Sequence, residues 1–180
     1  MIPAINVPKK TKSSYPLDKS EAKRHLRVDD NWHDDDDYIS NLIKAATQKA
    51  EQYIGKDIAE TVNVQEYYDW AGSSIQIPEG NFISFTSAIT DASVALTIDE
   101  TQVFYNSFYI EFTTSYSADP LTVTYKTGFE EGDCPILIKQ AILVKIGDLY
   151  DVDRQSYTEG SLKPNKAFES LLDSFRLVRF

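Results

Sequence analysis

The segment between Leu121 and Tyr157 constrains the fold of this chain more than any other part of the sequence. Its first residues, LTVTYKTG, alternate in polarity and place Leu121, Val123 and Tyr125 on one face, which is the period of a half-buried strand. Glycines then interrupt the pattern, and Pro135 opens the nearly all-apolar run ILIKQAILVKIGDLY. Proline suits the first turn of a helix because its missing N–H has no helical partner there. The sequence therefore predicts a strand, a turn and a helix in direct succession.

The predicted helix after Pro135 has no polar face. Its polar residues are scattered around the helix axis, and they are Lys139, Gln140, Lys145 and Asp148. A helix of this kind needs apolar neighbours on several sides. These neighbours can be other helices in the core of a monomer or the surface of another subunit, and the sequence leaves both readings open.

Length and cysteine content favour one self-sufficient domain. A domain of 180 residues buries roughly 70% of its unfolded surface without a disulfide or a metal. The single cysteine, Cys134, cannot form an internal disulfide, which excludes a disulfide-framed secreted module. The neighbouring carboxylate of Asp133 is expected to raise the thiol pKa, so Cys134 is predicted to be structural and not a nucleophile.

The chain is strongly acidic, with a net charge of −10 and a pI near 4.6. This is the opposite of the basic surface that grips a phosphate backbone, but an acidic wall would let a duplex slide past it. The sequence has no apolar run long enough to span a membrane, and MIPAINVPKK lacks the apolar core of a signal peptide. We therefore expect a soluble protein, made inside the cell, with no membrane partner.

Two helices are predicted in the first third of the chain. Residues 1–16 contain three prolines and no apolar period, which indicates an extended arm. Asp18 and Glu21 resemble a capping box at the start of a short helix that ends near Arg27. A second helix is indicated by an apolar stripe at helical spacing, and Gly55 is expected to end it. The stripe consists of Ile39, Leu42, Ile43, Ala46, Ala50, Tyr53 and Ile54.

The acidic run DDNWHDDDD, residues 29–37, resembles a metal site only in composition. A calcium loop of the EF-hand type alternates its ligands around a glycine and ends in glutamate, and this run does neither. The favoured interpretation is that Asp34 to Asp37 lie in a linker and in the first turn of the second helix, where negative charge is stabilised. A divalent ion that orders the linker remains the alternative.

Residues 62–127 change to a period of two and predict an antiparallel set of short strands. AGSS, residues 71–74, is expected to form a hairpin loop, and Asp99–Glu100 and Ala118–Pro120 are expected to form turns. Most of the eleven tyrosines lie in this region, where aromatic side chains favour cross-strand pairs and subunit contacts. The predicted strands cover residues 62–70, 74–79, 82–85, 94–98, 103–105, 107–112 and 121–127.

No residue pattern supports catalysis, a cofactor or a metal. The two histidines, His25 and His33, have no second ligand at zinc spacing, and no phosphate-binding glycine loop or G-x-S-x-G motif is present. We therefore predict a protein that is not an enzyme, with no catalytic, cofactor-binding or metal-binding residues.

The predicted fold is α+β, a small bundle of about four helices with an inserted antiparallel β-sheet region. The expected organisation is an arm at 1–16, a domain at 17–174 and a tail at 175–180. Within that domain the helical core covers 17–56 and 135–174, and the β insert covers 62–127. The tail interleaves arginine with apolar residues, which is typical of a free end that is disordered or inserted into a partner.

Three pieces of the sequence, about a third of the chain, resemble the phage head–tail connector family often called gp6-like. The first piece is SEAKRHLRVDD, which is similar to the family's opening helix at Glu21, Ala22, Lys23, His25, Leu26, Arg27, Val28 and Asp29. The second piece is the striped helix DYISNLIKAATQKAEQYIGKDI. The third is VTYKTGF followed by CPILIKQAILVKIGDLYDVDR.

The resemblance implies a structural adaptor of the virion, assembled as a dodecameric ring. The ring would dock to the portal on one side and to a stopper or tail-completion protein on the other, and the genome would pass through its lumen. By analogy with relatives, the portal-binding element would be Phe175, Arg176, Leu177, Val178, Arg179 and Phe180. First candidates for subunit or tail contacts are Tyr67, Tyr68, Trp70, Lys139 and Lys145. The alternative function is a monomeric β-rich module that binds a ligand in an aromatic groove.

Overall fold

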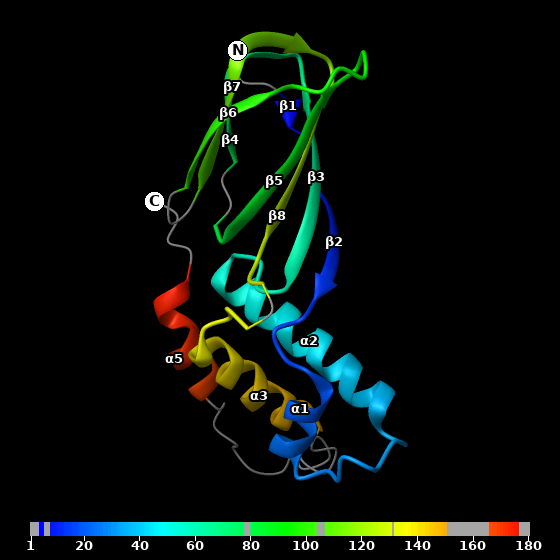
Figure 1. Cartoon of the computed structure of the whole chain (residues 1–180). Helices are drawn as coiled ribbons and strands as arrows, with labels where there is room; N and C mark the ends of the chain where they lie inside the picture. The colour runs from blue at the N-terminus through cyan, green and yellow to red at the C-terminus, as the bar shows by residue number, and fades with distance from the viewer. Residues whose placement is uncertain are drawn as a thin grey trace. The chain divides into compact units, whose positions relative to one another are not determined.

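The computed structural model describes residues 4–5, 8–77, 80–103, 107–130, 132–150 and 166–176. The chain divides into two compact units. The β unit comprises residues 1–14 and 59–130, and the helical unit comprises residues 15–58 and 131–180 (Figure 1). The fold is therefore α+β, as predicted. None of the helices in the described part of the chain is long and apolar enough to cross a membrane.

The helical unit is built on two long helices. These are α2 (Asp36–Ile54) and α3 (Ile136–Tyr150), which pack against each other; α1 (Lys19–Leu26) contacts both, as does α5 (Ala167–Leu172). A short 3-10 helix, η1 (Asp173–Phe175), continues α5. The buried core of the unit includes Leu17, Ala22, Ile39, Leu42, Ile43, Ala46, Ala50, Ile54, Ile58, Ile138, Ala141, Ile142, Leu143, Ile146, Phe168 and Leu172.

The ends of α1 and α2 lie where the sequence predicts them. The carboxylate of Asp18 accepts a hydrogen bond from the backbone N–H of Glu21 at 2.6 Å, which caps α1. Gly55 adopts the left-handed conformation with φ of 74° and donates its N–H to the carbonyl of Glu51 at 2.8 Å. Both boundaries are therefore confirmed, together with the Asp18 cap and the left-handed Gly55.

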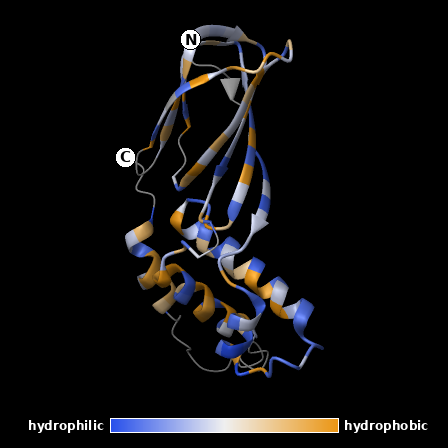
Figure 2. Cartoon of the chain, in the orientation of Figure 1, coloured by the Kyte–Doolittle hydropathy of each residue, from blue (hydrophilic) through white to orange (hydrophobic). Residues whose placement is uncertain are grey.

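Helix α3 also begins where it was predicted, directly after Pro135. Figure 2 colours most of its length hydrophobic. The side of α3 that packs in the unit contains Ile138 and Ile142, which are fully buried. In contrast, Ile136 is 64% exposed and Leu137 is 44% exposed at the start of the helix. The core of one unit therefore accounts for only part of the apolar surface of α3.

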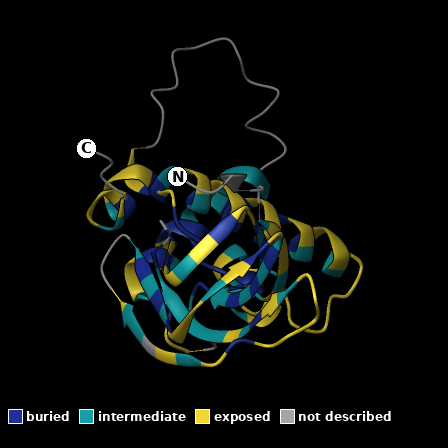
Figure 3. Ribbon diagram, turned by 90° about the horizontal axis from the view of Figure 1, so that it is seen from above, coloured by how far each residue is buried: buried dark blue, intermediate teal, exposed yellow. Residues whose placement is uncertain are grey.

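The β unit consists of two antiparallel sheets. The five-stranded sheet has the order β1 (Ala4–Ile5), β3 (Glu60–Tyr68), β8 (Leu121–Thr127), β5 (Phe82–Thr90), and β2 (Lys9–Ser14) also pairs with β3. The three-stranded sheet has the order β4 (Trp70–Ile77), β7 (Phe108–Ala118), β6 (Ile98–Val103). Buried and partly exposed residues alternate along β3 and β8. Figure 3 colours the described chain by burial, and segments of different burial follow one another along its strands.

Aromatic rings join the two sheets in one core. Phe108 on β7 makes an edge contact with Tyr125 on β8, with 5.3 Å between ring centroids, and the ring of Phe82 on β5 lies 4.5 Å from that of Phe108. The rings of Trp70 and Phe112 meet edge to face at 5.5 Å within the smaller sheet. Edge-to-face aromatic pairs stabilise a core beyond their buried area. The aromatic residues of this unit therefore serve first as core.

One end of the buried face of β3 is polar. Asn63 is fully buried, and its side-chain amide donates to the hydroxyl of Thr127 on β8 at 2.7 Å. The hydroxyl of Tyr125 donates to the side-chain oxygen of Gln65 at 3.1 Å. Gly128 follows β8 with φ of 105°, and a Cβ atom there would lie 2.2 Å from the carbonyl oxygen of Ala59. The β3 and β8 backbones approach closely at this end because residue 128 has no side chain.

Two predicted loops in the β region are wrong. AGSS, residues 71–74, lies inside β4, and the register shifts there between Gly72 and Ser74; the turn before it is at Asp69, with φ of 51°. Asp99–Glu100 lies within β6, where the register also shifts. In both cases turn-forming residues produce a strand irregularity instead of a reversal. The third predicted turn, Ala118–Pro120, does join β7 to β8.

Candidate functional site

The acidic run between α1 and α2 is organised around a buried lysine. Lys23, on α1, is only 2% exposed, although lysine is rarely buried. Its ammonium group donates hydrogen bonds to the backbone oxygens of Trp32 at 2.6 Å and Asp30 at 3.3 Å. It also forms an ion pair with one carboxylate oxygen of Asp36 in the first turn of α2. Lys23 therefore fixes the path of residues 29–35, called the acidic loop below.

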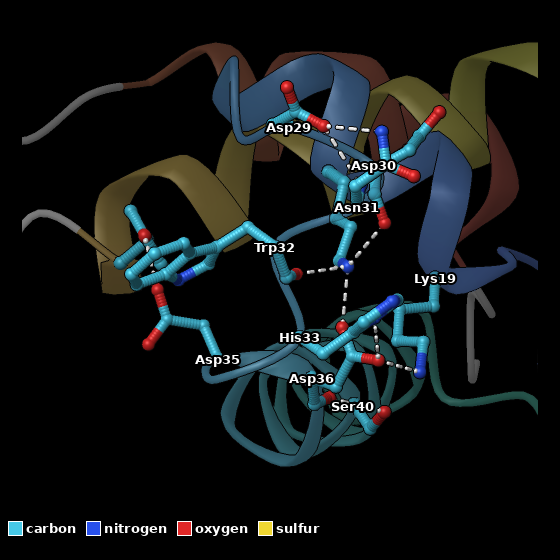
Figure 4. Close-up of polar contacts among 11 residues, drawn as sticks. Lys19, Asp29, Asp30, Asn31, Trp32, His33, Asp35, Asp36 and Ser40 are labelled. Atoms are coloured by element: carbon cyan, nitrogen blue, oxygen red, sulfur yellow. Dashed lines mark hydrogen bonds and ion pairs between the residues drawn. The ribbon is translucent and has the colours of Figure 1, made fainter.

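The carboxylate of Asp36 is the second fixed point of the acidic loop. Its Oδ2 atom lies 2.6 Å from Nζ of Lys19 and 3.3 Å from Nδ1 of His33 (Figure 4). Hydrogen bonds from Lys19 and then from Lys23 hold the pKa of Asp36 well below its usual range. Asp36 is thus ionised at every pH near neutrality and stays paired with α1.

Two other carboxylates in this region also accept hydrogen bonds. Asp29 accepts from the backbone N–H of Asn31 at 2.8 Å, and Asp35 accepts from the hydroxyl of Tyr150 at 3.2 Å (Figure 4). Among the residues that the structure describes, no group of three or more His, Cys, Asp and Glu side chains is arranged to hold a metal ion. The ammonium group of Lys23 contacts the backbone of the acidic loop directly.

The opening helix motif has a physical explanation in this geometry. Ala22 is fully buried in the core of the helical unit. Arg27 adopts the left-handed conformation with φ of 60° and ends α1, and the N–H of Val28 donates to the carbonyl of Lys23 at 3.0 Å. The sequence places Lys23 only in the opening helix motif and does not predict its burial, because a lysine on a helix normally indicates an exposed face.

A second cluster surrounds the point where the described chain ends. The ring of Tyr53 on α2 contacts both Arg176, whose guanidinium carbon is 5.5 Å from the ring centroid, and the ring of Phe168 on α5, with 6.1 Å between ring centroids. The hydroxyl of Tyr53 donates to the carboxylate of Asp173 at 2.5 Å. On α3, the ammonium group of Lys145 lies 6.0 Å from the centroid of Phe168. We call these five side chains the C-terminal anchor.

Two of the predicted portal-binding residues lie in the described part of the chain. Phe175, in η1, is partly buried, and Arg176 is exposed on one side of the Tyr53 ring. Leu177, Val178, Arg179 and Phe180 lie outside the described residues. The two described residues are therefore attached to the helical unit through its C-terminal anchor.

The structure separates the five predicted contact residues. Tyr67 is 1% exposed and Trp70 is 4% exposed, so both pack within the β unit, whereas Tyr68 is 37% exposed. Lys139 and Lys145 are partly buried on α3. Of the three aromatic candidates, only Tyr68 offers substantial surface to a partner. Other large apolar side chains that are exposed are Trp32, Tyr38, Ile89, Val94, Val103, Ile136 and Leu137.

Comparison with solved structures finds the same fold in particle neck proteins. A chain in the neck of a native gene transfer agent (GTA) particle, computed with C12 symmetry, has a TM-score of 0.73 and 15% identity, with 97% of each chain covered. A chain in the neck of an empty GTA particle, computed with C6 symmetry, has a TM-score of 0.71 and 16% identity, with 96% of this chain and 97% of that chain covered. A chain from the virion of a native GTA particle has a TM-score of 0.69 and 17% identity, with 95% and 96% covered.

Comparison by sequence identifies the family. No curated protein sequence matches this chain significantly. The family model of the phage gp6-like head-tail connector protein matches residues 20–133, which is more than half of the chain. The match includes nearly all of α1, the acidic loop, α2 and the strands from β3 to β8. This chain belongs to the family of phage gp6-like head-tail connector proteins.

Proposed function

We propose that this protein is a structural adaptor in the neck of a phage-like particle. In this function, twelve copies form a ring beneath the portal and join the DNA-filled head to the tail. The observation that carries the proposal is the family match, and it is supported by a fold shared with neck chains over nearly the whole of both chains. Two of those neck structures were computed with C6 and C12 symmetry, as a ring requires. The protein would be made in the host cytoplasm and act in the virion, without catalysis.

The start of α3 supplies a surface for contacts between subunits. Ile136 and Leu137 are exposed next to each other, 64% and 44% respectively, and Lys139 follows one turn later. A closed ring needs a patch on each copy that fits a different patch on the next copy, and apolar side chains dominate the centre of stable interfaces. We therefore place this end of α3 in the interface between neighbouring copies.

The two faces of the ring would have different partners. The segment Phe175–Phe180 would insert into the portal, and Tyr68 on the β unit would contact a stopper or tail-completion protein. Genomic DNA would pass through the lumen without being gripped, because a chain with a net charge of −10 repels phosphates.

The decisive test is electron microscopy, with mass measurement, of this protein mixed with the portal protein encoded in its own genome. We expect a twelve-fold ring stacked on the portal. A variant that lacks 175–180 should remain folded and fail to dock, and unchanged docking of that variant would contradict the portal-binding role of the tail. Absence of any complex between two folded components would favour the monomeric β-rich ligand-binding module.

The subunit interface has its own test. The substitution Ile136→Glu should prevent ring closure on the portal while leaving the free chain folded, because residue 136 is mostly exposed in the single chain. The matched control is Val103→Glu, since Val103 is 55% exposed in the β unit. A ring of normal mass with Ile136→Glu would show that the start of α3 is not an interface.

A further inference from the structure

We propose that Tyr53 is a positioning residue for the C-terminal segment: it fixes the point on the helical unit from which residues 177–180 leave. This inference rests on the proposed portal-binding role of that segment and adds to it the residue that controls it. Tyr53 makes no proposed contact with the portal. It acts through Asp173 and Arg176, the two ends of the last described turn.

The hydroxyl of Tyr53 holds the start of this turn. It donates to Oδ1 of Asp173 at 2.5 Å, and a hydrogen bond to an ionised acceptor is stronger than one between neutral groups. This hydrogen bond raises the pKa of Tyr53 above its ordinary value of 10.0, so the hydroxyl keeps its proton at neutral pH. Tyr53 is thus a permanent donor to Asp173.

The ring of Tyr53 holds the end of the same turn. The guanidinium group of Arg176 lies over the ring, 5.5 Å from its centroid, which is the geometry of a cation–π interaction. The ring of Phe168 also packs edge-on against Tyr53, and Lys145 lies over Phe168. These side chains therefore connect η1 to α2, α5 and α3.

The last turn depends on these contacts because its own backbone is short. Helix α5 has six residues and η1 has three, which is too few for a helix to persist without tertiary packing. The N–H of Arg176 makes one backbone hydrogen bond, to Asp173 at 3.3 Å. Without Tyr53, the tail would start from many positions, and docking would have to order the turn as well as the tail.

Portal binding by matched variants tests this inference. Tyr53→Phe keeps the ring and loses the hydroxyl, and Tyr53→Leu loses both. The measurement is the affinity of each variant for immobilised portal rings. We expect this affinity to fall roughly threefold to tenfold for Tyr53→Phe and further for Tyr53→Leu. Tyr150→Phe is the control, because it removes a hydroxyl that binds a carboxylate, that of Asp35, elsewhere in the helical unit. It should bind within about twofold of the parent chain.

A double-mutant cycle separates positioning from a general loss of stability. In a chain that lacks 177–180, Tyr53→Phe should not change any residual portal binding further, since no tail remains to be positioned. If Tyr53→Leu lowers the unfolding midpoint, the variant Asp173→Asn is used in its place. Asp173 is exposed, and asparagine has nearly the same shape as aspartate. Parent-like affinity of Tyr53→Phe and Asp173→Asn, with docking still lost on removal of the tail, would overturn this inference alone. Docking that survives removal of the tail would overturn the portal-binding role as well.

Discussion

At the scale of single residues, Lys23 determines how an unusually acidic segment can fold. Six aspartates lie between positions 29 and 37, and repulsion among them would favour an extended linker. Lys23 supplies one buried positive charge to two backbone oxygens and to Asp36, so the loop folds back over α1. A buried charge persists only when such partners surround it.

We therefore expect Lys23→Met to lower the free energy of unfolding by roughly 2–3 kcal/mol, because two backbone oxygens lose a charged donor. The measurement is urea-induced unfolding followed by circular dichroism. Lys19→Met is the control: its side chain is 43% exposed and pairs with the same carboxylate, so the loss should be under about 1 kcal/mol. Equal losses for the two variants would show that burial of Lys23 has no special effect.

Cys134 gives a prediction of pH dependence. Burial raises the pKa of its thiol from 9.0 to about 11, so above pH 9 the unfolded chain releases a proton that the folded chain keeps. Stability must therefore fall between these two pKa values. Relative to Cys134→Ala, the free energy of unfolding should be about 1.4 kcal/mol lower at about pH 10 than at about pH 8. If the difference in free energy of unfolding between the parent chain and Cys134→Ala is the same at both pH values, the raised pKa is contradicted.

At the scale of elements, β2 shows what polarity patterns do not reveal. The sequence KKTKSS has no apolar residue, and residues 1–16 were predicted to be an arm, yet Lys9–Ser14 pairs with β3 through its backbone. β3 reverses the usual pattern: Asn63 is fully buried, while Val62 and Val64 are partly exposed opposite β2. Strand pairing uses backbone groups that every sequence has, so composition alone does not show it.

Removal of residues 1–14 should expose the edge of β3, together with Val62 and Val64. We expect a lower melting temperature and faster aggregation, measured by differential scanning fluorimetry and light scattering, because an unpaired apolar edge favours association between strands. Removal of residues 1–8 is the matched control, because it leaves the pairing of Lys9–Ser14 with β3 in place. Identical behaviour of the two truncated proteins would mean that β2 does not protect this edge.

At the scale of the whole molecule, local signals were predicted well and contacts between distant segments were not. Asp18 and Gly55 act within a few residues of their own position, so the helix ends they determine were readable from sequence. Gly72 also had a readable signal, but a glycine suits both a turn and a bulge, and only pairing with the partner strand β7 distinguishes the two.

Tyr53 lies on the predicted stripe of α2, but its contacts with Asp173 and Arg176 join residues more than a hundred positions apart. The direction of the Cys134 pKa was anticipated from Asp133, whereas its cause is burial.

The charge of the whole chain leads to the last prediction, which concerns DNA. Binding to duplex DNA depends on phosphate contacts by cations, and this chain has a net charge of −10. We expect no retardation of a DNA duplex at about 50 mM NaCl in a gel-shift assay, with the free chain or with the assembled ring. Strand β2 carries two adjacent exposed lysines, so the double variant Lys9→Glu, Lys10→Glu tests their contribution to any DNA binding. The control replaces two exposed lysines on α2, Lys44 and Lys49, with glutamate. Salt-sensitive binding that disappears only in the β2 variant would mean that the protein grips DNA through this strand, and it would contradict free passage of the genome.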